Sequence, residues 1–465
     1  MRTLRDPQNL LAEGIAEIRT QFQVPAGFPP DVENAAALAA QRGPTAHADW
    51  TDRPFVTLDP AGASDLDQAF ALERAGPQPD ADILLHYAIA DVAWFVADDD
   101  PVDREAWKRG VTTYLPDGKA SLYPPMLSEK AASLLPDGPR ASVVLTVRVA
   151  ADGEARLEAA GRAVIRSRAK LAYATVRDED LPPGFADLAA RIAAAEDRRG
   201  AARVDPPEQE VERDAAGRLV LDFRPYSQAE ARNAALSLAA NLAVADAMLA
   251  AETGLFRVMA PPDAIAIERL RRTAEAFRID WPGAMSLDLF ERRLDPAQPR
   301  EAALMLAIRR AGQGASYAPH EPGETPWHAP MAASYAHATA PLRRLADRYV
   351  LRAVLSLTKG EPVEEAVETA FQRLPQVMRK AESRAAQVER AVIDLAETVL
   401  LAGQEGAVFP AIVTDVGETG ARIQLRDLPV VARTSAPGAL PGADLAVRLR
   451  SADPVRRTLE FDPVA

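Results

Sequence analysis

Cysteine is absent from the 465-residue sequence, and aromatic residues make up only 6% of it. The lack of cysteine excludes disulfides, thiolate catalysis and cysteine-ligated zinc, and it fits a reducing cytoplasm, the location that we expect. The five histidines are scattered without the spacing of a metal motif. Because 48% of the residues are hydrophobic, the chain can bury a large core, and its length allows about two or three domains.

Long uninterrupted hydrophobic runs are also missing. The longest apolar region, 236–251, is broken by Asn241 and Asp246, and residues 1–6 do not lead into an apolar core of the signal-peptide type. We therefore expect no membrane segment. A monomer is the expected oligomeric state.

Acidic residues outnumber basic ones by 67 to 54, which gives a net charge of −13. This excess argues against a protein that coats nucleic acid nonspecifically. Segments 161–170 and 343–352 are nevertheless basic. They are either solvated faces or parts of an internal phosphate track, and the sequence leaves both interpretations open.

One acidic loop stands out between two short β-prone runs, 55–58 and 69–73. It contains Asp59, Asp65 and Asp67 together with the turn residues Pro, Gly and Ser. Three carboxylates this close repel one another, and a hard cation such as Mg²⁺ would relieve that repulsion. A calcium-binding EF-hand is excluded because Phe70 stands where that loop needs glycine. By spacing alone, a metal site and a solvated acidic turn both remain open.

Several short motifs follow one another along the chain, at 55–59 with 65–67, 89–92, 113–116, 125–127, 335–344 and 388–392. Each motif is weak alone, but their order and spacing over roughly residues 25–402 resemble the pattern of the ribonuclease II family of processive 3′-to-5′ exoribonucleases.

The resemblance implies roles for particular residues. Asp59 and Asp65 would hold or orient Mg²⁺, with Mn²⁺ as an alternative ion. Asp67 matches the aspartate most directly tied to catalysis. Arg343 matches an arginine that would stabilise the phosphorane-like transition state, and Glu389 matches a late acidic residue near the site.

Each of these assignments has a plainer alternative. Arg343 could form an i,i+4 ion pair with Asp347 on a helix, and Glu389 could form a surface ion pair on a long helix. Tyr114 matches a tyrosine on which an RNA base stacks. The alternative is a core tyrosine whose hydroxyl is hydrogen-bonded.

Further RNA contacts are predicted around a second aromatic position. His328 falls where many family members have a stacking phenylalanine, and the adjacent Trp327 could serve instead. Arg344 is a candidate contact to RNA.

The chain departs from the family pattern at a few positions. Gln68 stands where the family has a fourth aspartate, and its amide oxygen could ligate Mg²⁺ without contributing charge. Ala234 and Ala235 replace a pair of glutamates, and Ala340 and Leu345 replace a serine and a tyrosine. These changes bear on metal geometry more than on the fold.

The domain organisation follows from the changes in pattern along the chain. We expect a helical N-terminal segment over 1–50 without a cold-shock barrel, a catalytic domain over 51–402 and an OB-fold barrel over 406–465. Residues 1–23 read as one amphipathic helix. The barrel contains seven arginines and seven acids, with Phe409 and Phe461 as its only aromatics, so we expect it to bind RNA weakly.

Several local signals predict individual elements. An Asp-Gly turn at 152–153 predicts a hairpin of 142–149 with 156–165. A capping box from Ser227 to Glu230 predicts a helix over 228–252. Pro341 suits the first turn of a helix that runs to about 357, and 376–401 reads as a third helix.

Together these observations predict an α+β ribonuclease II-type catalytic domain followed by an OB-fold barrel. The expected activity is metal-dependent 3′-to-5′ hydrolysis of single-stranded RNA to nucleoside 5′-monophosphates. An entrance without cold-shock barrels would be more open and would tolerate structured RNA. The alternative is a noncatalytic RNA-binding protein of the same fold, suggested by Gln68.

Overall fold

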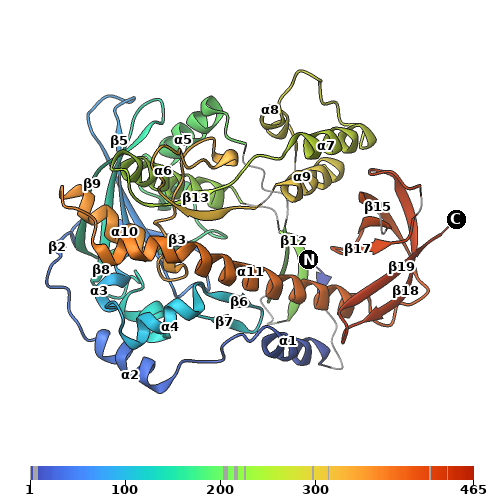
Figure 1. Ribbon diagram of the computed structural model, residues 1–465, viewed down its shortest axis with the longest axis horizontal. Helices are drawn as coiled ribbons and strands as arrows, with labels where there is room; N and C mark the ends of the chain where they lie inside the picture. The colour runs from blue at the N-terminus through green and yellow to red at the C-terminus, as the bar shows by residue number, and fades with distance from the viewer. Residues whose placement is uncertain are drawn as a thin grey trace.

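The computed structural model describes residues 2–3, 9–202, 208–213, 218–224, 227–295, 298–312, 314–417, 420–436 and 438–464. Figure 1 shows a large body built on a β-sheet, a smaller barrel, and a long helix, α11 (Glu365–Leu401), that runs from one to the other. The predicted α+β class is confirmed.

A seven-stranded mixed sheet forms the centre of the body. Its inner pairs are antiparallel, whereas β10 with β3 and β2 with β9 pair in parallel at the two edges. The middle strands are almost continuously buried because helices and loops cover both faces. In spatial order the strands are β10 (Ser167–Ala172), β3 (Phe55–Asp59), β4 (Gln68–Arg74), β5 (Ile83–Ala90), β8 (Arg140–Val149), β9 (Ala155–Ile165) and β2 (Ala48–Asp49).

The predicted hairpin of β8 and β9 is present, and its turn requires glycine. Gly153 has φ of 81°, in the left-handed region. A Cβ atom there would lie 2.0 Å from the carbonyl oxygen of Arg191. The turn and the helix that contains Arg191, α5 (Phe185–Arg199), therefore approach each other too closely for any other residue.

Helix α6 (Gln228–Ala250) is the central core helix. Its predicted capping box forms: the Ser227 side chain accepts from the Glu230 N–H, and the Glu230 carboxylate accepts from the Ser227 N–H. By length and apolar composition α6 could cross a membrane, but 67% of its most apolar window is buried inside the protein. It packs against α5, α10, β8 and β9.

The other elements of the body surround this core. Two two-stranded sheets pair β13 with β14 and β6 with β7, and a third small sheet has the order β1-β12-β11. The helices are α2 (Pro30–Ala39), α3 (Val92–Phe95), α4 (Pro101–Arg109), α7 (Ala264–Ala276), α8 (Leu287–Glu291) and α9 (Pro299–Ala311), with helical turns at Leu127–Ala131, Asp178–Asp180 and Ala329–Met331. The strands of the small sheets are β1 (Arg2–Thr3), β6 (Thr113–Leu115), β7 (Gly118–Ala120), β11 (Glu208–Arg213), β12 (Leu219–Arg224), β13 (Leu255–Val258) and β14 (Ser316–Pro319).

The N-terminal segment is only partly helical. α1 (Leu10–Gln21) docks on α11 through buried Leu11, Ile15 and Ile18. A Cβ on Gly14 would lie 2.6 Å from the Leu395 side chain, so the close approach depends on this glycine. The expected single helix over 1–23 is wrong at its start, because Arg2–Thr3 pairs with β12 as a short strand.

Helix α11 begins earlier than the sequence suggests. The expected helix over 376–401 is present, but it begins earlier, at Glu365, and continues through Pro375. Proline removes one backbone donor, but Phe371, Leu374 and Met378 continue the buried stripe on both sides of it. Packing of this stripe therefore outweighs the local penalty.

The C-terminal barrel is confirmed as a closed five-stranded barrel with the strand order β15-β16-β17-β19-β18. Its core contains Val413, Ile423, Leu449 and Phe461. Alternate residues of β16 and β18 face this core, as expected for a small barrel. The strands are β15 (Val408–Gly417), β16 (Gly420–Leu425), β17 (Val431–Thr434), β18 (Asp444–Asp453) and β19 (Thr458–Pro463).

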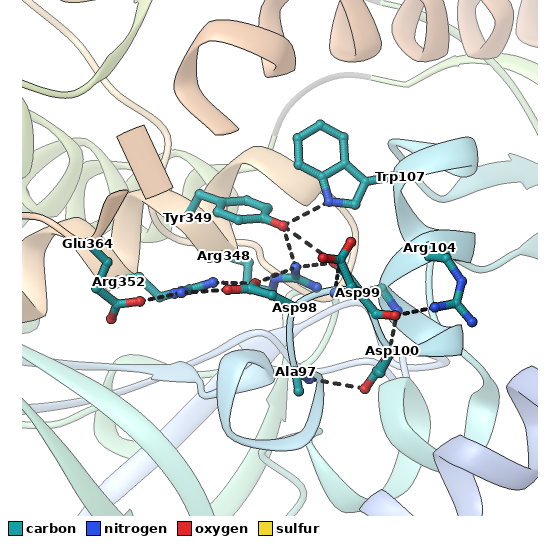
Figure 2. A network of polar contacts seen from close by, with 11 residues as sticks. Ala97, Asp98, Asp99, Asp100, Arg104, Trp107, Arg348, Tyr349, Arg352 and Glu364 are labelled. Atoms are coloured by element: carbon teal, nitrogen blue, oxygen red, sulfur yellow. Dashed lines mark hydrogen bonds and ion pairs between the residues drawn. The ribbon is translucent and has the colours of Figure 1, made fainter. Parts of the chain in front are cut away.

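Helix α10 (Leu345–Thr358) is anchored to α4 and to the segment before it by a polar network (Figure 2). The fully buried Arg348 pairs with Asp103 of α4 and donates to the Tyr349 hydroxyl at 2.6 Å. One turn later, Arg352 pairs with Asp98 at 2.6 and 2.9 Å. These contacts fix α10 against the segment that leads into α4.

Replacing Arg348 with Met should strongly destabilise the body. The change leaves the buried Asp103 carboxylate without its cation, which costs about 3–5 kcal/mol. Urea unfolding measures the loss. Arg42→Met, at an exposed position outside the network, is the matched control and should cost less than about 0.5 kcal/mol. Similar stabilities for the two variants would contradict this view of the network.

Glu397 joins α11 to the barrel. Its Oε1 accepts from the Val431 N–H of β17 at 2.7 Å and from the Gln209 amide of β11 at 2.6 Å. Burial raises its pKa from 4.5 to about 7, although the two donors oppose this shift. Ionisation of the buried carboxyl group therefore lowers the stability of the folded protein, because the charged form is desolvated.

The substitution Glu397→Gln should remove this effect, so the difference in stability between the variant and the wild type should depend on pH. Between pH 4.5 and 7 the folded protein binds a proton that the unfolded chain has lost, so the Glu397 term lowers wild-type stability as the pH rises through this window. We expect equal stabilities below pH 4.5, and a gain of up to about 3 kcal/mol for the variant above pH 7. Urea unfolding at both ends of the window measures it. A difference that does not change with pH would show that Glu397 is not the titrating group.

Candidate active site

The acidic loop lies between β3 and β4, and its backbone is tied down by neighbouring segments. Leu66 is fully buried, and its N–H donates to the Ser133 hydroxyl at 2.9 Å. Ser133 in turn donates to the Ser64 carbonyl at 2.7 Å. Lys170 of β10 donates to the carbonyls of Ala61 and Ala63. The loop is therefore a constrained turn that presents its carboxylates from the edge of the sheet.

A cavity of about 1070 Å³ opens over this loop. Its walls come from the acidic loop, the β6–β7 hairpin, one face of α6 and the segment 331–344. It contains most of the site residues predicted from the sequence together with others that were not foreseen. The principal lining residues are Asp59, Asp65, Asp67, Gln68, Tyr114, Lys119, Tyr173, Asn233, Ala234, Ser237, Asn241, Tyr335, Arg343 and Arg344.

Asp67 is the most buried carboxylate of the loop, with 5% of its surface exposed. Its Oδ1 accepts from the Leu342 N–H at 2.7 Å, and its Oδ2 lies 3.5 Å from Nε of Arg343. Burial raises the pKa of Asp67 to about 8, against the opposing effects of Arg343 and the Leu342 N–H. The pair is built by a loop from far along the chain, and it directs a partly exposed guanidinium into the cavity.

The segment around Arg343 is a turn, which corrects the expectation that Pro341 starts a helix. α10 begins only at Leu345, because Arg344 is extended and forms a β-bridge with Val111. The alternative pair of Arg343 with Asp347 does not form. Instead Arg344 binds the buried Asp347 through two hydrogen bonds, at 2.9 and 2.6 Å.

Arg344 therefore holds the turn in place, although it lines the cavity. The Asp347 carboxylate also accepts from the Ala340 N–H at 2.8 Å. The predicted contact of Arg344 to RNA would compete with this bidentate pair, so Arg343 is the better-placed arginine for a phosphate.

Asp59 differs from the other loop carboxylates because one of its oxygens is free. Its Oδ2 is buried and has no hydrogen-bond partner among the residues that the structure describes. The pKa of Asp59 is raised to about 6, mainly by burial and also by the charge of Asp65, against the opposing effects of Arg343 and Lys170. A buried carboxylate oxygen without a donor is a suitable ligand for a hard cation.

Asp65 is neutralised by a residue that the sequence did not reveal. Nζ of Lys119 lies 2.7 Å from Asp65 and 3.2 Å from Glu129, and the Tyr114 hydroxyl donates to Asp65 at 3.3 Å. Tyr114 and Lys119 are paired across the β6–β7 hairpin. The Asp-Gly sequence at 117–118 is a turn signal that could have predicted this pairing.

The three loop carboxylates therefore do not form a ready metal cluster. Among the described residues, no group of three or more His, Cys, Asp or Glu side chains is arranged to hold a metal ion. The reason is local charge pairing, since Asp65 faces Lys119 and Asp67 faces Arg343. Asp59 is the loop carboxylate that can offer an oxygen to a cation without losing a partner.

The contacts of Gln68 do not support its predicted role as a metal ligand. Its Nε2 donates to the Thr339 carbonyl at 2.7 Å. Its Oε1 accepts from the Tyr87 hydroxyl and lies 3.3 Å from the Ser237 hydroxyl. Both ends of the amide are thus engaged, and Gln68 fastens β4 to the turn that carries Arg343.

The second predicted aromatic position is placed differently from expectation. The His328 ring is 6% exposed and packs edge-on against Tyr335, with ring centroids 5.4 Å apart. Burial, then Arg257, lowers its pKa to about 4. A buried ring cannot offer a stacking face, so Tyr335, which lines the cavity, is the aromatic residue available there.

Two other predicted residues lie outside the cavity lining. Trp327 is 49% exposed, and its contact with RNA stays a prediction. Glu389 is exposed on α11, away from the lining residues. The geometry does not bring Glu389 to the acidic loop, and its catalytic role is unsupported.

The wall contributed by α6 contains Glu230 in its first turn and uncharged polar side chains from Asn233 onward. Asn233 donates to the Tyr173 hydroxyl at 2.9 Å. Asn241 donates to the Tyr335 hydroxyl at 3.1 Å and accepts from the Ala338 N–H at 2.9 Å. These asparagines connect α6 to both sides of the cavity, and they were not foreseen because asparagine inside an apolar helix reads only as an interruption.

The substitution Gln68→Glu tests whether Gln68 has a structural role or is a metal ligand. The substitution replaces the donor to Thr339 with an oxygen, so we expect a loss of about 1–3 kcal/mol in stability and no gain in Mg²⁺ affinity. Thermal unfolding and calorimetric Mg²⁺ titration measure the two effects. Gln387→Glu, on the exposed surface of α11, is the control. Tighter Mg²⁺ binding without destabilisation would restore the ligand assignment.

Comparison with known proteins places the chain in a family. Residues 47–360 match the RNB domain, and residues 407–464 match the RNase II-type exonuclease C-terminal S1 domain. Ribonuclease R of Aquifex aeolicus is 29% identical over 405 residues, which cover 82% of this chain and 56% of that protein. The chain thus spans about half the length of the curated relatives it matches.

Solved structures agree with the fold. Mycoplasma genitalium RNase R in complex with ribose-methylated single-stranded RNA matches 100% of this chain and 79% of its own, with a TM-score of 0.86 and 19% identity. The same enzyme in complex with double-stranded RNA matches with a TM-score of 0.84, at 20% identity and over 85% of its own chain. The matched domains and the shared fold confirm the predicted resemblance, and this chain belongs to the RNB-domain family of RNase II-type proteins.

Proposed function

We propose that this chain is a divalent-metal-dependent 3′-to-5′ exoribonuclease that degrades single-stranded RNA processively to nucleoside 5′-monophosphates. The observation that carries the proposal is the buried Asp67 carboxylate beside Arg343 on the wall of a cavity of about 1070 Å³. The family membership and the relatives called Ribonuclease R support the same reaction.

Arg343 is the group that faces the phosphate. Its side chain is 47% exposed toward the cavity while its Nε stays near Asp67. A planar guanidinium can donate two parallel hydrogen bonds to phosphate oxygens and stabilise the charge that develops there. Asp67 holds this fork in position and, with its raised pKa, can hold a proton at the reacting centre.

Asp59 is the residue best suited to hold the metal ion. Mg²⁺ is commonly bound by one or two carboxylates, several waters and a substrate phosphate, and the unpartnered Oδ2 of Asp59 fits that requirement. A bound divalent ion would supply charge neutralisation and an activated water. Mn²⁺ has similar ligand preferences and is the alternative.

Aromatic side chains provide the sequence-independent contacts that an exoribonuclease needs. Tyr114 is 53% exposed and lies on the β6–β7 hairpin beside Asp65. Tyr335 lines the opposite region of the cavity. Bases can stack on such rings whatever their identity. Structured RNA as a substrate, a monomeric state and a cytoplasmic location stay predictions.

The competing function is a noncatalytic RNA-binding protein of the same fold. It is suggested by the neutral Gln68 and by the absence of a preformed three-acid cluster in the described part of the chain. This alternative predicts bound but intact RNA, so one experiment separates the two functions.

That experiment is digestion of 5′-labelled oligoadenylate with Mg²⁺. We expect the full-length RNA to be converted to a short 5′-labelled end product without a ladder of intermediates, and 5′-AMP to be released. Asp67→Asn should lower kcat by at least about 10²-fold, because an amide cannot take up or release a proton at the reacting centre. RNA binding by the variant, measured by fluorescence anisotropy, should stay near wild type.

Asp80→Asn, an exposed carboxylate away from the cavity, is the control and should keep full activity. Turnover by Asp67→Asn close to that of wild type would remove Asp67 from the mechanism. Intact RNA with the wild-type protein at every metal concentration, despite tight binding, would favour the noncatalytic alternative.

A further inference from the structure

The β6–β7 hairpin brings two side chains to the same wall of the catalytic cavity. Tyr114 and Lys119 are directly opposite each other in its antiparallel register, so their side chains leave the same face of the hairpin. Both residues line the cavity, and both contact Asp65. The Tyr114 hydroxyl donates to its carboxylate at 3.3 Å, and Nζ of Lys119 lies 2.7 Å from it. One hairpin thus supplies an aromatic ring and a cation.

Lys119 is shared with a second carboxylate from another segment. Its Nζ lies 3.2 Å from Oε1 of Glu129, which belongs to the helical turn Leu127–Ala131. The side chains of Lys119, Asp65 and Glu129 are 19%, 13% and 27% exposed. One ammonium group therefore stands between two largely buried carboxylates, and the formal charges leave one negative charge in excess.

The position of this ammonium group is fixed by the hairpin that carries it. Arg19 of α1 donates to Asp117, at the turn of the hairpin, through two hydrogen bonds of 3.0 and 2.8 Å. Ala120, which follows Lys119, is buried in the cluster that joins α1 to α11, and Figure 1 shows the hairpin beside α11. An ion pair of mobile surface side chains contributes little, because ordering them is costly. Lys119 is already ordered.

The two carboxylates are also held by groups other than Lys119. Oδ2 of Asp65 accepts from the Tyr114 hydroxyl, and Oε2 of Glu129 accepts from the Ser64 hydroxyl at 3.0 Å. Lys119 contacts the other oxygen of each, Oδ1 of Asp65 and Oε1 of Glu129. Removal of the ammonium group would leave these two oxygens facing one space. Mg²⁺ is commonly bound by one or two carboxylates together with waters, so this space suits a divalent cation.

This position is electrostatically coupled to the carboxylate proposed to hold the metal ion. The charge of Asp65 contributes to the raised pKa of Asp59, so the two groups act on each other. Enzymes that cleave phosphodiesters often use two metal ions, which stabilise the attacking and the leaving oxygen. At the Asp65 side of this loop, the cation is part of the protein.

We propose that Lys119 takes the place of a second divalent ion beside Asp65, so that the reaction needs a single divalent ion, at Asp59. The proposal rests on the proposed function for the role of that ion. Lys119 acts through Asp65 and is therefore a positioning residue. Its ammonium group is a compact charge that is covalently attached, so it stays beside Asp65 at every metal concentration.

The first test counts bound metal ions in the absence of RNA. Protein freed of metal is titrated with Mn²⁺, and free Mn²⁺ is followed by electron paramagnetic resonance. Lys119→Met is compared with wild type and with Lys119→Arg, which keeps the positive charge. Lys108→Met is the matched control, because Lys108 is 72% exposed and pairs with Glu105 at 3.2 Å, away from the cavity lining.

We expect Lys119→Met to bind about one more Mn²⁺ ion per chain than wild type, because the oxygens of Asp65 and Glu129 become available as ligands. Lys119→Arg and Lys108→Met should bind as many ions as wild type. Adding Glu129→Gln to Lys119→Met should remove the gain. Lys119→Gln replaces Lys119→Met if circular dichroism shows that the latter is not folded.

The second test measures the order of the reaction in metal. At low Mg²⁺ concentration the rate of oligoadenylate hydrolysis should rise with about the first power of the concentration for wild type and with about the second power for Lys119→Met. Lys119→Arg should restore the first-power dependence. A lysine with a purely structural role would change the rate without changing this order.

Equal numbers of bound ions in wild type, Lys119→Met and Lys119→Gln would overturn the proposal. A wild-type protein that loses a bound ion on Glu129→Gln would overturn it as well, because a metal ion would then already occupy the position assigned to Lys119. The proposed function fails separately, if wild type hydrolyses no RNA at any metal concentration. The Mn²⁺ count does not depend on turnover and still decides whether Lys119 occupies a cation position.

Discussion

The pairing of Asp67 with the Leu342 N–H and Arg343 is the contact on which the rest of the site depends. It joins segments 275 residues apart in the sequence, and a buried carboxylate is costly without such partners. The Gln68 amide adds a second link to the same turn through Thr339. These contacts provide partners for the buried Asp67 carboxylate and fix the turn before α10. They also orient Arg343 into the cavity.

Helix α11 also joins segments that are distant in the sequence, and it does so across the whole molecule. It packs against α1, α10, β6, β11 and β14 and then against β18 and β19 of the barrel. Glu397 completes the junction through a hydrogen bond to β17. Because α11 is continuous through Pro375, the barrel is held in a defined position relative to the catalytic cavity.

Charge in the site is arranged differently from what a row of aspartates suggests. Lys119 and Arg343 face two of the three loop carboxylates, and Gln68 and Ala234 contribute no charge. A less negative cavity repels an incoming phosphodiester less, and Asp59 remains the carboxylate with a free oxygen. This site therefore differs from a cluster built of carboxylates alone, because side-chain cations neutralise two of its three loop carboxylates.

Elements whose signals are local could be predicted from the sequence. Periodicity and turn chemistry, which act over a few residues, predict the strand–loop–strand around Asp59 and Asp67, the hairpin turn at Gly153, the capping box of α6 and the five-stranded barrel. The pairing of charges, in contrast, depends on how distant segments pack together. Lys119 beside Asp65, the extended Arg344 that delays α10 and the burial of His328 depend on segments distant in the chain. Such pairings are set by packing and desolvation across the whole fold, and no local pattern encodes them.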